Sequence, residues 1–67
     1  MQLFVAMESD YDGAWIYGVY DTLDGAMAIL TEALGPNPRR AMKERYVFVE
    51  EWPLNGINRM QTHEYTP

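Results

Sequence analysis

Nucleophilic catalysis needs a serine, threonine, cysteine or lysine held beside a base. The 67-residue chain has no cysteine and only one serine, one histidine and one lysine. Ser9 falls in an acidic turn, Lys43 lies among arginines, and His63 is near the end of the chain. A Ser–His–acid triad would have to be assembled from loop tips, so these residues predict no catalytic set.

Paired carboxylates are the next candidates. Glu50 and Glu51 are adjacent in a predicted strand, so their side chains should point to opposite faces. Asp10 and Asp12 are two residues apart, so their side chains could point the same way and meet in a hairpin loop. There the sequence Asp-Tyr-Asp-Gly is similar to part of a calcium loop. The further oxygen ligands and the distal glutamate of that pattern are missing, and one histidine without cysteine disfavours a transition-metal site. We therefore expect no metal, and the isolated glycines predict no nucleotide-binding loop.

Charge is unevenly distributed along the chain, whose formal net charge is −5. Four of its five basic residues fall within residues 39–45, and we expect that run to be solvated or to balance the chain's own acids. Acidic proteins are repelled by nucleic acids and anionic membranes and attracted to basic surfaces. A partner with a basic surface is one interpretation, and simple solubility is the other. The candidate acidic partner-binding residues are Glu8, Asp10, Asp12, Asp21 and Asp24.

Two strands are predicted before the first helix. Residues 3–7 alternate with a period of two, and residues 14–20 are dense in β-branched and aromatic side chains. Residues 8–13 between them are rich in turn formers and predict a hairpin loop longer than two residues. The apolar N-terminal segment lacks a basic flank and a cleavage site, so we expect a strand rather than a signal peptide, and a cytoplasmic protein.

A helix is predicted at about residues 22–34, where apolar side chains recur at helical spacing. Asp21 is the expected N-cap, Asp24 favours the positive end of the helix dipole, and Gly35 followed by proline should end the helix. Residues 39–45 could add one helical turn or a loop.

The remaining chain predicts a third strand at residues 46–52, ended by Pro53. Asn55-Gly56 indicates a tight turn, and residues 58–67 could form a short returning strand or a tail. We therefore predict one α+β domain over residues 1–57. Its sheet is three-stranded and antiparallel, or mixed, in the order 2-1-3 with one helix on one face. The alternative places the third strand beside the second as a parallel βαβ unit.

A single helix covers only one face of such a sheet, yet both predicted faces are apolar or aromatic. An uncovered apolar face on a small soluble domain typically marks an interaction site, and tyrosine and tryptophan are favoured there. The alternative is that the C-terminal segment folds back over that face. The candidate aromatic partner-binding residues are Trp15, Tyr17, Tyr46, Phe48 and Trp52.

Residues 17–26, Tyr-Gly-Val-Tyr-Asp-Thr-Leu-Asp-Gly-Ala, and 46–55, Tyr-Val-Phe-Val-Glu-Glu-Trp-Pro-Leu-Asn, carry a family resemblance. The chain resembles a family of small uncharacterised bacteriophage and prophage proteins over about residues 3 to 57. The resemblance implies a strand, an acidic loop, a strand, a capped helix and a last strand. It implies no enzymatic activity and suggests a phage accessory protein.

These observations together favour a non-catalytic protein-binding module. Its specific form would be a phage protein that inhibits or modulates a host protein, such as an acidic inhibitor of the anti-CRISPR type acting in the host cytoplasm. The first alternative is a self-associating structural protein that forms a homodimer through its open sheet face or edge. The second is a small enzyme or ligand sensor with a pocket between helix and sheet. No cofactor is expected.

Overall fold

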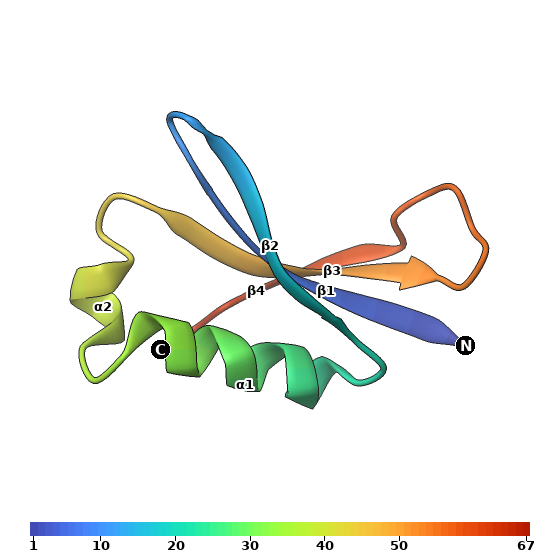
Figure 1. Cartoon of the computed structure of the whole chain (residues 1–67), viewed down its shortest axis with the longest axis horizontal. Helices are drawn as coiled ribbons and strands as arrows, with labels where there is room; N and C mark the ends of the chain where they lie inside the picture. Colours follow the sequence, from blue (N-terminus) through green and yellow to red (C-terminus); the bar gives the residue numbers. More distant parts are fainter.

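The computed structural model describes residues 1–67, and its sheet is built around the first strand (Figure 1). Four antiparallel strands pair in the order β2-β1-β3-β4, which confirms the predicted 2-1-3 order, with the returning strand added beside β3. Because β1 lies between β2 and β3, the alternative βαβ arrangement is not adopted. The elements are β1 (Gln2–Asp10), β2 (Gly13–Tyr20), α1 (Leu23–Leu34), α2 (Pro38–Ala41), β3 (Tyr46–Pro53) and β4 (Gln61–Glu64).

The β1–β2 hairpin is tighter than the sequence predicts. Asp10 pairs with Gly13, so only Tyr11 and Asp12 remain in the loop. The backbone N–H of Asp12 donates to Asp10 Oδ1 at 2.8 Å, and Gly13 has a φ of 144°, which favours glycine. The polar residues before the loop stay in the strand because β1 is paired on both sides, with Ser9 held by β2 and β3 at once.

The cap of α1 lies one residue later than predicted. Thr22, not Asp21, is the N-cap, because the first helical hydrogen bond runs from Ala26 N to Thr22 O. Thr22 Oγ1 then accepts the backbone N–H of Gly25 at 3.0 Å. Gly35 ends the helix as predicted, with a φ of 76°. Neither helix has the length and apolar composition needed to cross a membrane.

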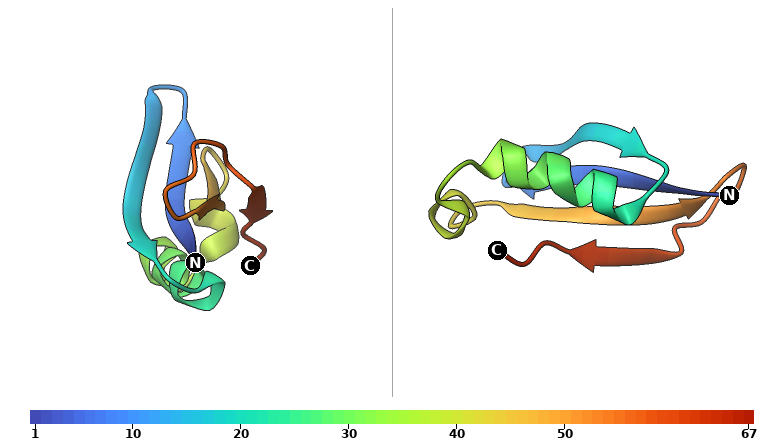
Figure 2. Two further views of the ribbon diagram at one scale, coloured as in Figure 1. Left: turned by 90° about the vertical axis from the view of Figure 1, so that its right-hand side faces the viewer. Right: turned by 90° about the horizontal axis from the view of Figure 1, so that it is seen from below.

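The core lies between α1 and one face of the sheet. The right-hand view of Figure 2 looks onto α1 with the strands behind it. Partly buried side chains such as Phe4, Tyr20 and Tyr65 surround the core. A core this small is expected for a short chain, in which the buried fraction of the surface is low. The six buried residues are Ala6, Ala26, Leu30, Leu34, Val47 and Val49.

The C-terminal segment extends the sheet and does not fold over its uncovered face. His63 in β4 pairs with Val49 of β3. Beyond β4, the backbone N–H of Tyr65 donates to Val47 O at 3.4 Å, and its phenol lies 3.0 Å from the hydroxyl of Thr31 in α1. These contacts hold the segment on the helix side, so the alternative in which it covers the other face is wrong.

Candidate protein-binding surface

The sheet face away from α1 is apolar and is covered by no other element of the chain. In β1, Ala6 enters the core, while Leu3, Val5 and Met7 alternate to the other side. Their direct cross-strand partners share that side because paired residues project to the same face. We call this surface the open face and define it by Leu3, Val5, Met7, Ile16, Val19, Tyr46, Phe48, Glu50 and Trp52.

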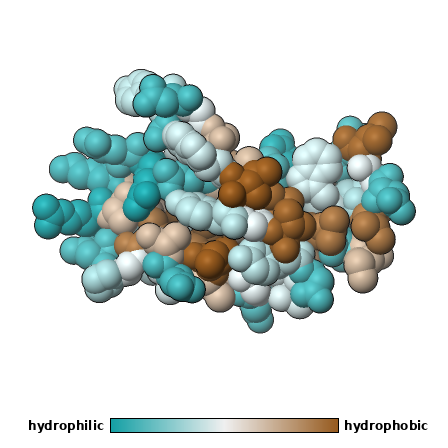
Figure 3. Space-filling model, in the orientation of Figure 1, coloured by the Kyte–Doolittle hydropathy of each residue, from teal (hydrophilic) through white to brown (hydrophobic).

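Several side chains of the open face are strongly exposed. Ile16 is 62% exposed and Val19 is 56% exposed, although both are aliphatic. Figure 3 shows hydrophobic side chains gathered across the middle of the molecule and toward the β3–β4 end, with hydrophilic side chains around the α2 end. A contiguous patch of this kind differs from the scattered apolar residues that every soluble protein exposes.

The open face is hollowed into a groove of about 370 Å³. Its floor is aliphatic, and its wall is formed by Trp52, Pro53 and the turn that follows. In that turn Gly56 N donates to Pro53 O at 3.0 Å, and Asn55 has a φ of 64°. A Cβ on Gly56 would lie 2.1 Å from Pro53 Cγ, so the turn requires glycine there. The predicted tight turn is therefore present and shapes one end of the groove.

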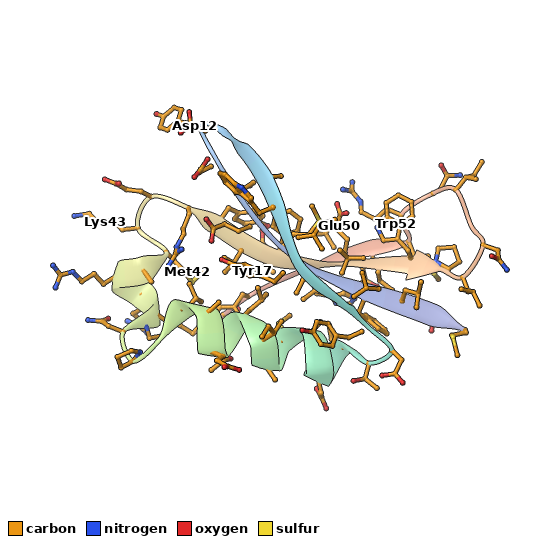
Figure 4. The ribbon with its side chains drawn as sticks, viewed as in Figure 1. Asp12, Tyr17, Met42, Lys43, Glu50 and Trp52 are labelled. Carbon is orange, nitrogen blue, oxygen red and sulfur yellow. The ribbon has the colours of Figure 1, made fainter.

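Glu50 fixes the tryptophan that borders this groove. Its carboxylate accepts from Trp52 Nε1 at 3.3 Å and from Arg59 Nη1 at 2.8 Å. Figure 4 labels Glu50 and Trp52, which both project from β3. The Glu50 charge is thus neutralised within the chain, and the indole is held in one orientation at the rim of an apolar surface.

A second aromatic pair lies at the other end of β3. The rings of Tyr46 and Phe48 pack with centroids 4.9 Å apart. The Tyr46 phenol donates to Glu64 Oε1 of β4 at 2.6 Å, and this hydrogen bond is the main cause that raises the pKa of Tyr46 above 10.0. Three of the five aromatic candidates, Tyr46, Phe48 and Trp52, therefore share the open face.

The other two aromatic candidates lie on the helix side. Met7 pairs with Ile16 and Ala6 with Gly18, so Tyr17 is an extra residue, a β-bulge. The bulge shifts the alternation of β2, and Tyr17 therefore does not share a face with Val19, as strict period-two counting predicts. The Tyr17 phenol donates to Glu8 on the helix side (Figure 4). Burial, followed by this hydrogen bond, raises the pKa of Tyr17 above 10.0.

Trp15 pairs with Glu8 and projects to the same side as Tyr17. Glu8 in turn forms an ion pair with Arg45, with Nη1 and Oε1 3.0 Å apart. The basic run thus balances one of the chain's own acids, as one of the predicted alternatives has it. This carboxylate is occupied within the chain and nearly buried, so it is a poor candidate for recognising a partner.

The remaining acidic candidates form two separate pairs. Asp10 and Asp12 lie at the hairpin tip, and Lys43 lines the same shallow hollow from the segment after α2. Asp21 and Asp24 lie at the other end of β2, where α1 begins. All four are exposed. The strand between the pairs is eight residues long, which corresponds to about 26 Å.

The residues that could do chemistry are kept apart by the sheet. His63 Nε2 lies 2.8 Å from Glu51 Oε1 on the helix side, whereas Ser9 follows the alternation of Met7 and projects to the open face. Glu50 and Glu51 project to opposite faces, as predicted. No three His, Cys, Asp or Glu side chains are grouped as a metal site, and α1 lines no cavity against the sheet.

Sequence reasoning named only aromatic residues and missed the aliphatic floor of the groove. The alternation of residues 3–7 already places Leu3, Val5 and Met7 on one face, and this pattern could have identified them. No sequence pattern pointed to Arg59, which neutralises Glu50, because it lies in an irregular loop.

Comparison with protein-family models, with curated proteins and with solved structures gives no match. The functional interpretation therefore depends on the geometry of the chain itself. The phage origin suggested by residues 17–26 and 46–55 stays a prediction.

Proposed function

We propose that the chain is a non-catalytic protein-binding module that docks a partner protein on the open face. The observation that carries this proposal is the apolar surface on the side of the sheet that α1 leaves uncovered. Exposed aliphatic side chains such as Ile16 and Val19 lose contact with water when a partner covers them, and each Å² of buried apolar area contributes roughly 25 cal/mol.

Trp52 is the expected anchor of this contact. Tryptophan is enriched among the few interface residues that carry most of the binding free energy. Here the hydrogen bond to Glu50 orients the indole in advance, so less side-chain entropy is lost on binding. The groove beside it offers space for an apolar side chain of the partner.

The size of the open face limits the kind of interface. Three strands spaced about 4.8 Å apart and about 25 Å long present roughly 350 Å² of flat surface. A standard interface buries about 800 Å² on each partner. The open face therefore supplies an apolar centre, and contacts at the edges of the sheet must supply the rest.

The more specific form that we propose is an acidic phage accessory protein that inhibits a host protein. Its support is the net charge of −5 and the family resemblance of residues 17–26 and 46–55. A host target with a basic surface would be attracted over distances of about a Debye length.

The test compares Trp52 with an exposed aromatic side chain that lies outside both the open face and β2. Tagged wild type, Trp52→Ala and the control Tyr11→Ala are used to capture partners from host lysate, after circular dichroism has shown that all three fold. We expect one specific protein to be captured by wild type and Tyr11→Ala and lost with Trp52→Ala. Capture that is independent of Trp52, or no specific capture by wild type, contradicts the proposal.

A homodimer through the open face is the second candidate function. The specific observation in its favour is that Glu50 is already paired with Arg59, so the charge at the groove is neutralised, and Glu64 at the β4 edge is the carboxylate that would oppose a second copy. Light scattering coupled to size-exclusion chromatography measures the mass directly. A monomer at high protein concentration excludes this candidate.

A further inference from the structure

The outer edge of β2 is an unpaired strand edge. β2 is the terminal strand of the sheet and pairs only with β1. The other backbone hydrogen bonds, in turns, loops and caps, do not involve β2, and no side chain donates to or accepts from its backbone. The left-hand view of Figure 2 shows no element beyond this strand. Its outward N–H and C=O groups are therefore available to another strand.

This edge lacks most of the devices with which proteins normally prevent strand addition. The eight residues of β2, Gly-Ala-Trp-Ile-Tyr-Gly-Val-Tyr, include no charge and no proline. Trp15, Ile16 and Val19 are about half exposed or more, at 49%, 62% and 56%. The opposite edge differs, because β4 has only four residues and carries Glu64. The Tyr17 bulge bends the strand locally and leaves four residues before it and three after it for pairing.

Negative charge flanks the uncharged edge at both ends. Asp10 and Asp12 lie before β2, and Asp21 and Asp24 lie after it. None of these four carboxylates takes part in an ion pair within the chain, although Lys43 and Arg45 line shallow hollows together with residues of the hairpin tip. An incoming strand would meet unpaired peptide groups in the middle and carboxylates at its two ends.

We propose that β2 binds an extended segment of a partner protein as a fifth strand, and that this segment has an apolar middle of about eight residues with Lys or Arg at both ends. Main-chain hydrogen bonds supply affinity in such strand addition, and flanking charges select the partner. This inference rests on the proposed protein-binding function and names its partner. The two surfaces are continuous, because Ile16 and Val19 belong both to β2 and to the open face.

Charge also decides against a second copy as the occupant of this edge. If two β2 strands paired antiparallel, Asp12 of one chain would meet Asp21 of the other. If they paired in parallel, the two hairpin tips would bring Asp12 beside Asp12. Like charges are brought together in both cases, which disfavours self-pairing.

The experiment measures the affinity of the full chain for synthetic peptides. The probe has two lysines, eight alternating valine and threonine residues, and two more lysines. One control peptide replaces the lysines by glutamates, and a second carries N-methyl groups on all eight middle residues, which removes the hydrogen-bond donors along both edges. Fluorescence anisotropy gives the affinities, and amide hydrogen exchange locates the binding.

We expect the lysine-flanked peptide to bind and to slow amide exchange in Gly13–Tyr20. The glutamate-flanked peptide should bind at least about tenfold more weakly, and N-methylation should abolish binding. Asp12→Asn and Asp21→Asn should each weaken binding of the lysine-flanked peptide by about two- to fivefold. The matched control Glu32→Gln, which removes an exposed charge from α1, should leave it unchanged.

Three results would overturn the inference. The first is no binding of the lysine-flanked peptide at millimolar concentration. The second is equal binding of the lysine-flanked and glutamate-flanked peptides. The third is protection at Leu3 and Val5 in place of β2. Each leaves the proposed protein-binding function standing, because that function is tested separately by the dependence of lysate capture on Trp52.

Discussion

Replacing valine by threonine on each face of the sheet tests whether the open face is truly uncovered. Val49 is 0% exposed beneath α1, and Val19 is 56% exposed on the open face. Valine and threonine side chains have nearly the same shape, and threonine is as well suited to strands as valine. The substitution therefore differs only in where the new hydroxyl is placed.

The cost follows from the surroundings of each hydroxyl. At Val49 the new group is enclosed by the apolar core, and burial of a hydroxyl without a partner costs about 1–3 kcal/mol. At Val19 water can hydrate it, so the free energy of unfolding should change by no more than about 0.5 kcal/mol. In a domain of this size 1 kcal/mol shifts the Tm by roughly 4–8 °C. Val49→Thr should therefore lower the Tm by about 4–24 °C, and Val19→Thr by less than about 4 °C.

Urea and thermal unfolding at several protein concentrations measure both changes, with an unchanged m-value as the check that the same surface is exposed on unfolding. An equal loss of stability for the two variants would refute the reasoning. If that loss also depended on protein concentration, the open face would be buried against another copy of the chain, because association stabilises the folded state by mass action.

Three further predictions concern the two ends of α1 and Tyr46. Thr22→Ala should cost about 1 kcal/mol of unfolding free energy in urea, and Asp21→Ala clearly less; the reverse order would contradict the assigned cap. Gly35→Ala should cost about 1–3 kcal/mol because its φ is 76°, with no steric clash nearby; an unchanged urea midpoint would contradict this. The raised pKa of Tyr46 stabilises the fold below pH 10.0, and this contribution is lost as pH rises through the folded-state pKa. The stability advantage of wild type over Tyr46→Phe should therefore fall at alkaline pH, and a difference independent of pH would count against the hydrogen bond to Glu64.

The sheet order could be predicted because the sequence leaves few ways to cover its apolar stripes. Residues 3–7 alternate cleanly between apolar faces. The apolar side of the helix at residues 22–34 must pack against a sheet face that is about three strands wide. A central first strand satisfies both requirements. One face of the sheet is expected to stay uncovered, because a single helix of twelve residues cannot lie on both sides of it.

Local detail was harder to predict because long-range pairing decided it. The stretch from Glu8 to Asp10 has turn-forming composition, yet it stays extended because β3 pairs with Glu8 and Ser9 on the side away from β2. His63 lies in a polar segment for which the sequence leaves a short strand and a tail open, and Glu51 and the ring of Phe4 hold it in β4. Neither partner is close in sequence, so no local pattern could indicate these contacts.

The bulge at Tyr17 had a local signature, and it determines the chemistry of both faces. Gly18 sits inside an otherwise strong strand, and a glycine there often marks a bulge or a close approach. Both are present, because a Cβ on Gly18 would lie 2.8 Å from the phenol oxygen of Tyr20.

With strict alternation, Tyr17 would lie beside Val19 on the open face and Ile16 would turn toward the helix. The extra residue reverses this. The phenol of Tyr17 reaches the Glu8–Arg45 pair on the helix side, where a hydrogen-bonding group has a partner. Ile16, which needs none, is left on the open face. The same displacement that satisfies a polar network on one side of β2 therefore makes the other side more aliphatic, and so better suited to contact a partner protein than to hold water or a metal.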